Sequence, residues 1–200
     1  MDEVPGATVM TEPDLSEVVL VRHGETAWTV GGRHTSRTDV PLTPNGMRQA
    51  ELLGDRLAGR SFALVLTSPR QRATETCRLA GFGEVAQVSE DLVEWDYGDY
   101  EGRTTPEIRS EVPHWSLWRD GVPAGETAAA VGGRADRVIE RLRRARADAL
   151  VFSHGHFLRV LAARWIGLAP SDGRRFALDP ASLSALGWER EVPVLARWNQ

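Results

Sequence analysis

Two short apolar runs, far apart in the chain, end in the same kind of polar loop. Residues 18–21 are followed by Arg22-His23-Gly24, and residues 149–152 are followed by Ser153-His154-Gly155. Uninterrupted apolar runs of this length, rich in β-branched residues, are typical of strands that are buried on both faces of a sheet. We therefore expect two buried strands, each with a histidine just beyond its carboxyl end.

Helix signals alternate with these strands. Thr43-Pro44 and Ser68-Pro69 each match a helix start, with a hydroxyl side chain as N-cap and a proline in the first turn. The Gly-, Pro- and Trp-rich stretch 94–125 predicts irregular structure with at most a short helix. The other expected elements are strands at 62–66, 84–88, 182–188 and 192–198, and helices at 71–80, 127–147 and 157–167.

This alternation predicts an α/β fold, a three-layer α/β/α sandwich with a largely parallel central sheet. In such sheets, ligands bind outside the carboxyl ends of the strands. Four side chains that can handle an anion fall at such ends, namely Arg22, His23, Arg72 and His154. We therefore expect one shared site at this edge of the sheet.

Composition limits the partners of the protein. With 24 Lys and Arg against 28 Asp and Glu, the net charge of -4 favours neither nucleic acid nor an anionic membrane as a partner. The acidic residues 1–16 lack a secretory signal, so we expect a flexible tail there, a single domain over 17–200 and a cytoplasmic protein. The lone Cys77 excludes an intrachain disulfide and a Cys-rich zinc cluster, and we expect it to be buried on a helix.

The side chains at the strand ends suit phosphate chemistry. Arg22 and Arg72 could each offer a planar, permanently charged fork to two phosphoryl oxygens. A neutral His23 could attack phosphorus while its other ring nitrogen donates to a backbone carbonyl, and His154 would add a contact to the phosphoryl oxygens. Glu94, expected in an apolar and aromatic setting beside Trp95 and Tyr97, could be the acid that protonates the leaving group.

Each of these residues also has a simpler interpretation. His23 alone could be a loop or core residue, Arg72 a helix surface residue and Glu94 a solvated charge, so only the set as a whole supports a site. His34 and His114 are expected to be loop residues. The tryptophans at 115, 118 and 165 are expected to pack in the core.

The motifs resemble those of a known family. Arg22-His23-Gly24-Glu25-Thr26 resembles the signature of the histidine phosphatase superfamily, which includes the phosphoglycerate mutases. The resemblance covers nearly all of the chain after residue 17, and its further segments are Leu42 to Gly46, Ser68 to Ala73, Glu94 to Gly102, Gly125 to Thr127 and Ser153 to Gly155.

The resemblance implies a phosphoglycerate mutase-like fold and a site that needs no metal and no other cofactor. It implies that His23 becomes phosphorylated, that Arg22, Arg72 and His154 complete the phosphate pocket, and that Glu94 is the proton donor. The choice of Glu94 over three nearby carboxylates depends mainly on this resemblance; the others are Asp91, Asp96 and Glu101.

Segments 94–102, 118–121 and 155–159 are similar to a branch of small acid phosphatases and sugar-bisphosphate phosphatases. Mutases usually carry Asn where this chain has Thr29, and Gly where it has Ser36. The candidates for contacts with the substrate are therefore Thr29, Thr35 and Ser36. The candidates for contacts with a second anionic group of the substrate are Arg103, His156 and Arg159, each of which could instead form a structural salt bridge.

The expected function is hydrolysis of small phosphate monoesters, such as sugar phosphates, through a phosphohistidine on His23. Phosphoglycerate mutase-type transfer is the first alternative, and a non-catalytic phosphate-binding protein on the same fold is the second. A dinucleotide-binding enzyme is disfavoured because no GxGxxG follows the first strand. The expected partner is a small phosphorylated substrate, and the sequence leaves open whether the protein forms a homodimer.

Overall fold

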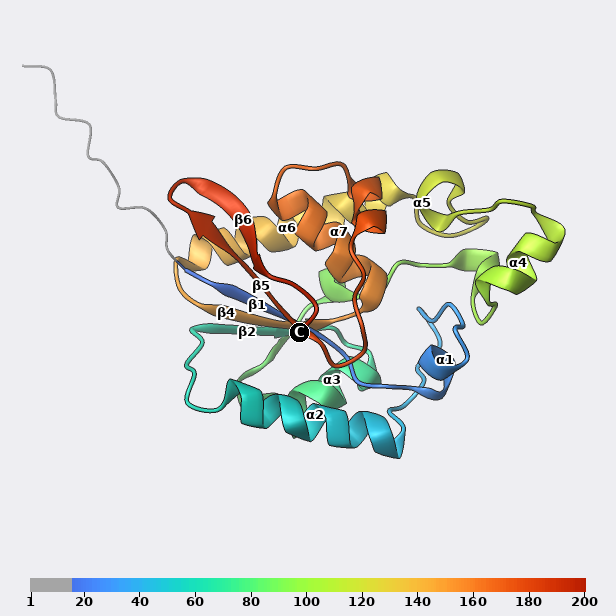
Figure 1. The fold of residues 1–200 in the computed structure, drawn as a ribbon. Coiled ribbons are helices and arrows are strands. Elements are labelled where there is room, and N and C mark those ends of the chain that lie inside the picture. Colours follow the sequence, from blue (N-terminus) through green and yellow to red (C-terminus); the bar gives the residue numbers. More distant parts are fainter. Residues whose placement is uncertain (1–15) are drawn as a thin grey trace, which may run out of the picture.

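A computed structural model describes residues 16–200, so all but the last residue of the expected N-terminal tail lies outside the described residues. Figure 1 shows one mixed sheet with helices on both of its faces. The strands, given in chain order, are β1 (Val18–Arg22), β2 (Leu64–Thr67), β3 (Gln87–Val88), β4 (Ala149–Ser153), β5 (Leu183–Glu189) and β6 (Val192–Arg197).

The order of the strands across the sheet is β3-β2-β4-β1-β5-β6. β4 lies between β1 and β2 and is parallel to both, and β3 is parallel to β2. β5 is antiparallel to β1 and to β6. The predicted α/β sandwich with a largely parallel sheet is therefore confirmed, as is the pairing of the two C-terminal strands.

The helices form two layers. α2 (Pro44–Leu57) and α3 (Gln71–Leu79) cover one face of the sheet, while α6 (Ala128–Ala145) and α7 (Gly155–Trp165) cover the other (Figure 1). Three shorter helices lie beyond the carboxyl ends of the parallel strands, namely α1 (Ala27–Val30), α4 (Thr105–Glu111) and α5 (Leu117–Asp120).

Alternation along β1 produces two cores. Val18 and Leu20 belong to the cluster under α6 and α7, whereas Val19 and Val21 belong to the cluster under α2 and α3. Cys77 is buried in the second cluster, as expected. Because successive side chains of a strand point to opposite faces, an apolar run without alternation needs a covering layer on each face, and the helices provide both.

Several expected boundaries were wrong. Residues 83–85 form a 3-10 helix, so the strand expected at 84–88 is reduced to two exposed residues at the sheet edge. The segment 94–125 contains two short helices instead of at most one, and a capping box on Thr104 and Glu107 begins the first of them. The strand expected at 62–66 begins and ends slightly later. The helix expected at 157–167 begins two residues earlier, at Gly155, because of contacts in the candidate site that are described below.

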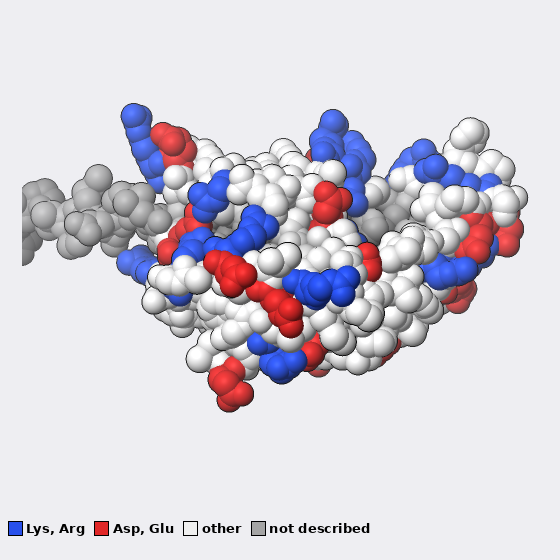
Figure 2. Space-filling view, turned by 60° about the horizontal axis from the view of Figure 1, so that its bottom comes forward, with Lys and Arg blue, Asp and Glu red and all other residues white. Residues whose placement is uncertain are grey.

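The face on the α2 side of the molecule carries mixed charges. Figure 2 shows basic and acidic side chains next to one another there, without a broad field of one sign. No helix among residues 16–200 has both the length and the apolar character needed to span a bilayer. A strong anion site on this protein therefore requires a local arrangement of side chains.

Candidate active site

His23 lies directly after β1 and is almost fully buried. Its Nδ1 is 2.8 Å from the carbonyl oxygen of Gly24, which can only accept a hydrogen bond. Nδ1 therefore carries the proton of the neutral ring, and Nε2 keeps its lone pair. Burial, and then the guanidinium groups of Arg72 and Arg22, hold the pKa of His23 well below its usual value. The ring is thus neutral at physiological pH and has a free lone pair on Nε2, the form in which an imidazole can act as a nucleophile.

The loop after His23 is fixed by close packing. The backbone N–H of Gly24 donates to the hydroxyl of Thr76, which itself donates to the carbonyl of Arg72 on α3. A Cβ on Gly24 would lie 2.5 Å from the carbonyl oxygen of Gly46, at the start of α2. Only glycine permits this approach, so the loop after His23 packs closely against α2 and is hydrogen-bonded to α3.

Arg72 lies in the first turn of α3 and is completely buried. Its terminal nitrogens donate to the carbonyls of Thr35, Ser36 and Thr38 at 3.2, 3.3 and 3.2 Å. The carboxylate of Glu101 accepts the backbone N–H groups of Ser36 and Thr38 and so holds that turn. The Nε of Arg72 is buried without a partner in the described structure, which leaves a donor for a ligand.

Arg22 ends β1 and provides the second guanidinium. Its Nη1 donates to the carbonyl of Leu178, and its Nε is buried with no hydrogen-bond partner among residues 16–200. A Cβ on Gly155 would lie 3.3 Å from the Cζ of Arg22, so the guanidinium packs against the start of α7. Buried charged donors that are left unpaired are costly in a protein, and an anionic ligand would satisfy both arginines.

His154 follows β4 and is fully buried. Its ring centroid lies 5.1 Å from that of His23, with an interplanar angle of 65°. Its Nε2 is 2.7 Å from the hydroxyl oxygen of Ser68, which directly follows β2, and its Nδ1 has no partner in the described structure. Three neighbouring parallel strands thus converge on the two imidazoles, as the fold predicts.

The surroundings of Glu94 differ from those expected. Its carboxylate accepts backbone N–H groups from Trp95 at 2.9 Å, His156 at 3.0 Å and Phe157 at 2.8 Å. The last two belong to the first turn of α7, so a residue from a distant segment caps that helix. The expectation of a mainly apolar and aromatic setting was therefore wrong, because the helix start supplies polar donors.

The three other carboxylates considered for the acid lie elsewhere. Asp91 pairs with Arg137, and Asp96 pairs with Arg37. Glu101 is occupied by the backbone N–H groups already described. Only Glu94, of these four, lines the pocket that contains His23.

This pocket has a volume of about 180 Å³ and opens beside His23. Of the expected site residues, Arg72 and His154 lie fully buried and are not part of its lining. Ser36 is buried, and Arg103 pairs with Glu111 and also lies outside the lining. The expected residues in the lining are Arg22, His23, Thr29, Thr35, Glu94, His156 and Arg159.

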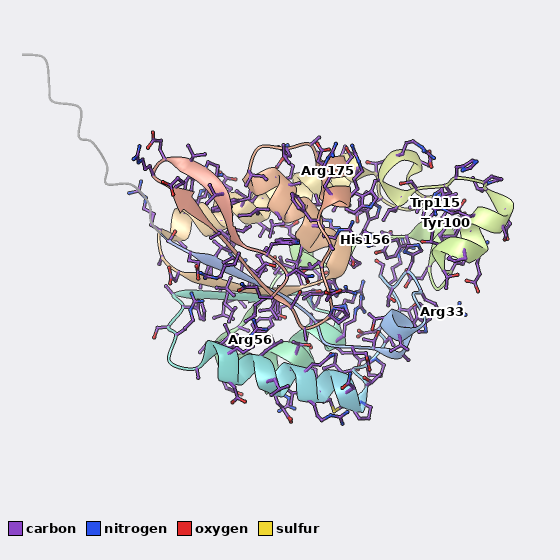
Figure 3. The ribbon with its side chains drawn as sticks, in the orientation of Figure 1. Arg33, Arg56, Tyr100, Trp115, His156 and Arg175 are labelled. Atoms are coloured by element: carbon purple, nitrogen blue, oxygen red, sulfur yellow. The ribbon has the colours of Figure 1, made fainter. Side chains whose placement is uncertain are left out.

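The outer wall contains residues that the sequence did not assign to the site. Arg33, His34 and Tyr97 line it, and the Tyr97 hydroxyl lies 2.7 Å from Nδ1 of His156. Figure 3 shows Arg33, Trp115 and His156 on the same side of the molecule, although they come from three separate segments. The position of His34 just beyond the first motif was the one available signal, because the other contacts are formed only in the folded chain.

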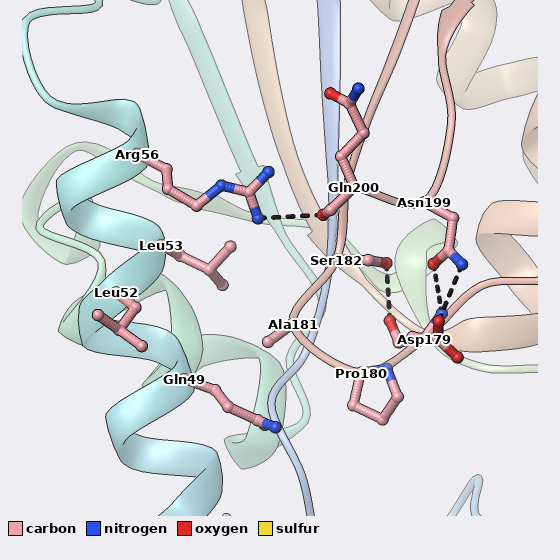
Figure 4. A pocket seen from close by; sticks show the side chains of 10 residues that line it. All are labelled: Gln49, Leu52, Leu53, Arg56, Asp179, Pro180, Ala181, Ser182, Asn199 and Gln200. Atoms are coloured by element: carbon pink, nitrogen blue, oxygen red, sulfur yellow. Dashed lines mark hydrogen bonds between the residues drawn. The ribbon is translucent and has the colours of Figure 1, made fainter.

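A second pocket lies between α2 and the end of the described chain (Figure 4). Its volume is about 340 Å³, larger than that of the pocket at His23. It is lined by residues such as Leu52, Arg56 and Asp179, and by none of the expected site residues. The candidate site is therefore chosen by the buried donors without partners near His23 and not by pocket volume.

Fold and candidate site together define an α/β protein in which two imidazoles and two guanidinium groups gather near the carboxyl ends of parallel strands, beside a pocket lined by Arg22 and His23. Comparison with known proteins agrees. Residues 18–200 match the family model for the histidine phosphatase superfamily, branch 1. An acid phosphatase of Mycobacterium tuberculosis is 45% identical over 183 residues, which cover 90% of each chain.

Two further relatives are informative. A sedoheptulose 1,7-bisphosphatase of Saccharomyces cerevisiae is 38% identical over 183 residues, covering 75% of this chain and 67% of that protein. The solved structure of an open reading frame of Mycobacterium tuberculosis superposes with a TM-score of 0.87 at 44% identity, covering 92% of this chain and 97% of the other. The chain belongs to the histidine phosphatase superfamily, and it is a phosphatase.

Proposed function

We propose that this protein hydrolyses small phosphate monoesters of the sugar-phosphate type through a phosphohistidine on His23. The observation that carries the proposal is the bond between Nδ1 of His23 and the carbonyl of Gly24. It leaves the Nε2 lone pair free inside a pocket that is also lined by Arg22 and Glu94. Fixing one imidazole nitrogen as a donor prepares the other as a nucleophile.

In the first step, Nε2 of His23 attacks phosphorus, and the ester P–O bond breaks as the P–N bond forms. Arg22 and Arg72 bind the phosphoryl oxygens with the donors that lack partners in the described structure. Glu94 acts as the general acid, and its carboxyl group gives a proton to the leaving alkoxide. The products of this step are a free alcohol and phosphorylated His23.

In the second step, the Glu94 carboxylate removes a proton from water as the water oxygen attacks phosphorus. The P–N bond breaks and His23 returns to its neutral form, while inorganic phosphate leaves. The hydrogen bonds from Trp95, His156 and Phe157 hold the carboxylate in one orientation through both steps. The same residue thus acts as acid and then as base.

The pocket favours a small alcohol with a second anionic group. A volume of about 180 Å³ accommodates little beyond a phosphoryl group and a short sugar. Arg159 lines this pocket, and no carboxylate of residues 16–200 lies within salt-bridge distance of it; its guanidinium lies 4.7 Å above the ring of Trp118. The likeness to an acid phosphatase and to a sugar bisphosphatase supports the same class of substrate.

The test is a panel of sugar phosphates, bisphosphates, phosphoglycerates and p-nitrophenyl phosphate, assayed with and without EDTA. We expect release of inorganic phosphate that survives EDTA and disappears in His23→Ala. A matched control is His114→Asn, because His114 is exposed and its positive φ suits asparagine.

Full activity of His23→Ala would contradict the proposal. Transfer of phosphate between the 2- and 3-positions of phosphoglycerate, faster than its release, would support the mutase alternative instead. Binding of vanadate without turnover on any monoester would indicate a phosphate-binding protein.

A further inference from the structure

Ser68 lies at the centre of the site but outside the pocket lining. It directly follows β2, is fully buried, and its backbone N–H donates to the carbonyl of Phe152 on β4 at 3.0 Å. Its hydroxyl oxygen is 2.7 Å from Nε2 of His154. The hydroxyl is therefore held against the second imidazole by the sheet itself.

The direction of this hydrogen bond follows from the other partner of the hydroxyl. Ser68 Oγ accepts the backbone N–H of Arg70 at 3.4 Å, a long bond that uses one of its lone pairs. The hydroxyl proton still needs an acceptor, and Nε2 of His154 is the acceptor within reach. If Nε2 carried the imidazole proton, the buried hydroxyl proton would be left without an acceptor, which is unfavourable. Ser68 is thus the donor and Nε2 the acceptor.

The remaining nitrogen of His154 must then carry the proton of the neutral ring. The pKa of His154 lies well below its usual value because the ring is buried and because Arg72, His23 and Arg22 oppose a further positive charge. Nδ1 is buried and has no partner in the described structure. A free Nδ1–H beside His23 is a donor without an acceptor, as are the Nε groups of Arg22 and Arg72.

We propose that Ser68 is a positioning residue that holds His154 as the neutral Nδ1–H tautomer, so that His154 donates this N–H to a phosphoryl oxygen. The two histidines then present opposite nitrogens to the substrate. His23 offers a bare Nε2, fixed by the carbonyl of Gly24, and His154 offers a protonated Nδ1, fixed by the hydroxyl of Ser68. The role in binding phosphoryl oxygens rests on the proposed function, whereas the tautomer does not.

One consequence is a hydrogen bond to phosphate that needs no charge on the ring. If the ring of His154 were positively charged, it could lose its extra proton to the nearby ring of His23 or to the phosphate. A neutral donor strengthens as negative charge develops on the phosphoryl oxygens and remains in place through both steps.

The tautomer can be measured without turnover. In protein with ¹⁵N-labelled histidine, long-range ¹H–¹⁵N spectra at pH 7 distinguish a protonated ring nitrogen from a bare one, and the spectrum of His154→Gln identifies the signals of His154. We expect a protonated Nδ1 and a bare Nε2, and a shift of the Nδ1 signal on addition of orthovanadate. A protonated Nε2 with a bare Nδ1, or protons on both nitrogens, would overturn the proposal even if the enzyme is active.

Variants then test the role in catalysis. Ser68→Ala should lower kcat/KM for p-nitrophenyl phosphate by about tenfold or more and weaken vanadate binding, with loss of the single tautomer in the spectrum. Ser68→Thr keeps the hydroxyl and should restore the tautomer and much of the rate. Ser184→Ala is the matched control, because Ser184 is a buried serine of β5 that accepts the N–H of Asn199.

The outcomes separate the two proposals. Wild-type rate and vanadate affinity in Ser68→Ala, or an equal loss in Ser184→Ala, would overturn the role of Ser68 in catalysis. A wild-type protein that shows the expected tautomer but hydrolyses no monoester would contradict the proposed function and leave the tautomer standing. If Ser68→Ala does not fold, the wild-type spectrum still decides the question of the tautomer.

Discussion

The carboxylate of Glu94 accepts the backbone N–H of Phe157 at 2.8 Å, in the first turn of α7. His154, at the N-cap of this helix, makes no side-chain capping bond of its own. The residue proposed as proton donor is therefore tied to the helix that follows the second imidazole. This relationship explains why α7 begins at Gly155, and it fixes the Glu94 carboxylate relative to the helix that follows His154.

Replacing Glu94 should affect substrates according to their leaving groups. An alkoxide requires a proton as it leaves, whereas p-nitrophenolate leaves readily without one. We expect Glu94→Gln to reduce kcat on a sugar phosphate by about 10²- to 10⁴-fold, and to reduce kcat on p-nitrophenyl phosphate much less. Comparison of the two kcat ratios is the measurement.

The structural role of Glu94 needs a separate control, because glutamine also changes the capping of α7. Thermal unfolding of Glu94→Gln reports that effect. Equal losses on both substrates would show that Glu94 only supports the fold of the site and is not the acid.

Removal of the Arg159 guanidinium should change substrate preference. Arg159→Met is expected to lower kcat/KM for a sugar bisphosphate by about 10- to 100-fold, the loss of one charge-assisted contact, and to affect the matching monophosphate only slightly. Arg103→Met is the control, because Arg103 pairs with Glu111 outside the pocket. If the ratio of kcat/KM for the bisphosphate to that for the monophosphate is the same in both variants, Arg159 does not bind the second anionic group of the substrate.

The pH dependence of kcat/KM should reflect the neutral His23. Because burial and the two arginines hold the pKa of His23 well below 6.5, the nucleophile stays unprotonated into the acidic range. We expect a bell-shaped profile whose acid limb lies well below pH 6.5, with an acidic optimum. Values of kcat/KM that decline tenfold for each unit by which the pH falls below 6.5 would contradict this assignment. Values that stay flat from acid to alkaline pH would contradict it as well.

Protein stability should fall on acidification, in part through His34. Burial lowers the pKa of His34 to about 4. Between pH 6.5 and about 4 the unfolded chain takes up a proton that the folded chain does not, so the free energy of unfolding decreases across that range and not above it. His34→Gln should reduce the loss between pH 7 and pH 5 by on the order of 1 to 2 kcal/mol.

Urea unfolding at pH 7 and pH 5 measures this effect. His114→Asn, at an exposed position, should leave the difference between the two pH values as in the wild type. An unchanged difference in His34→Gln would contradict the partly buried, neutral state of the His34 ring.

Local patterns predicted the centre of the fold, and contacts between distant segments decided the rest. The two apolar runs that end at Arg22 and Ser153 are buried strands because each carries its own apolar signal. The polar setting of Glu94 could not be predicted, since two of its three backbone donors, the N–H groups of His156 and Phe157, lie 62 and 63 residues further along the chain. Arg103 could not be distinguished from a substrate ligand, because its salt bridge with Glu111 forms only once α4 has folded and has brought its last residue near Arg103.

The central claim is that His23 carries the phosphoryl group during turnover. Rapid quenching with ³²P-labelled substrate, followed by peptide mapping, tests it directly. The account predicts an acid-labile, alkali-stable phosphoramidate on His23 that forms and decays at rates compatible with kcat and is absent from His23→Ala. Turnover without a labelled protein, or a label on any other residue, would contradict it.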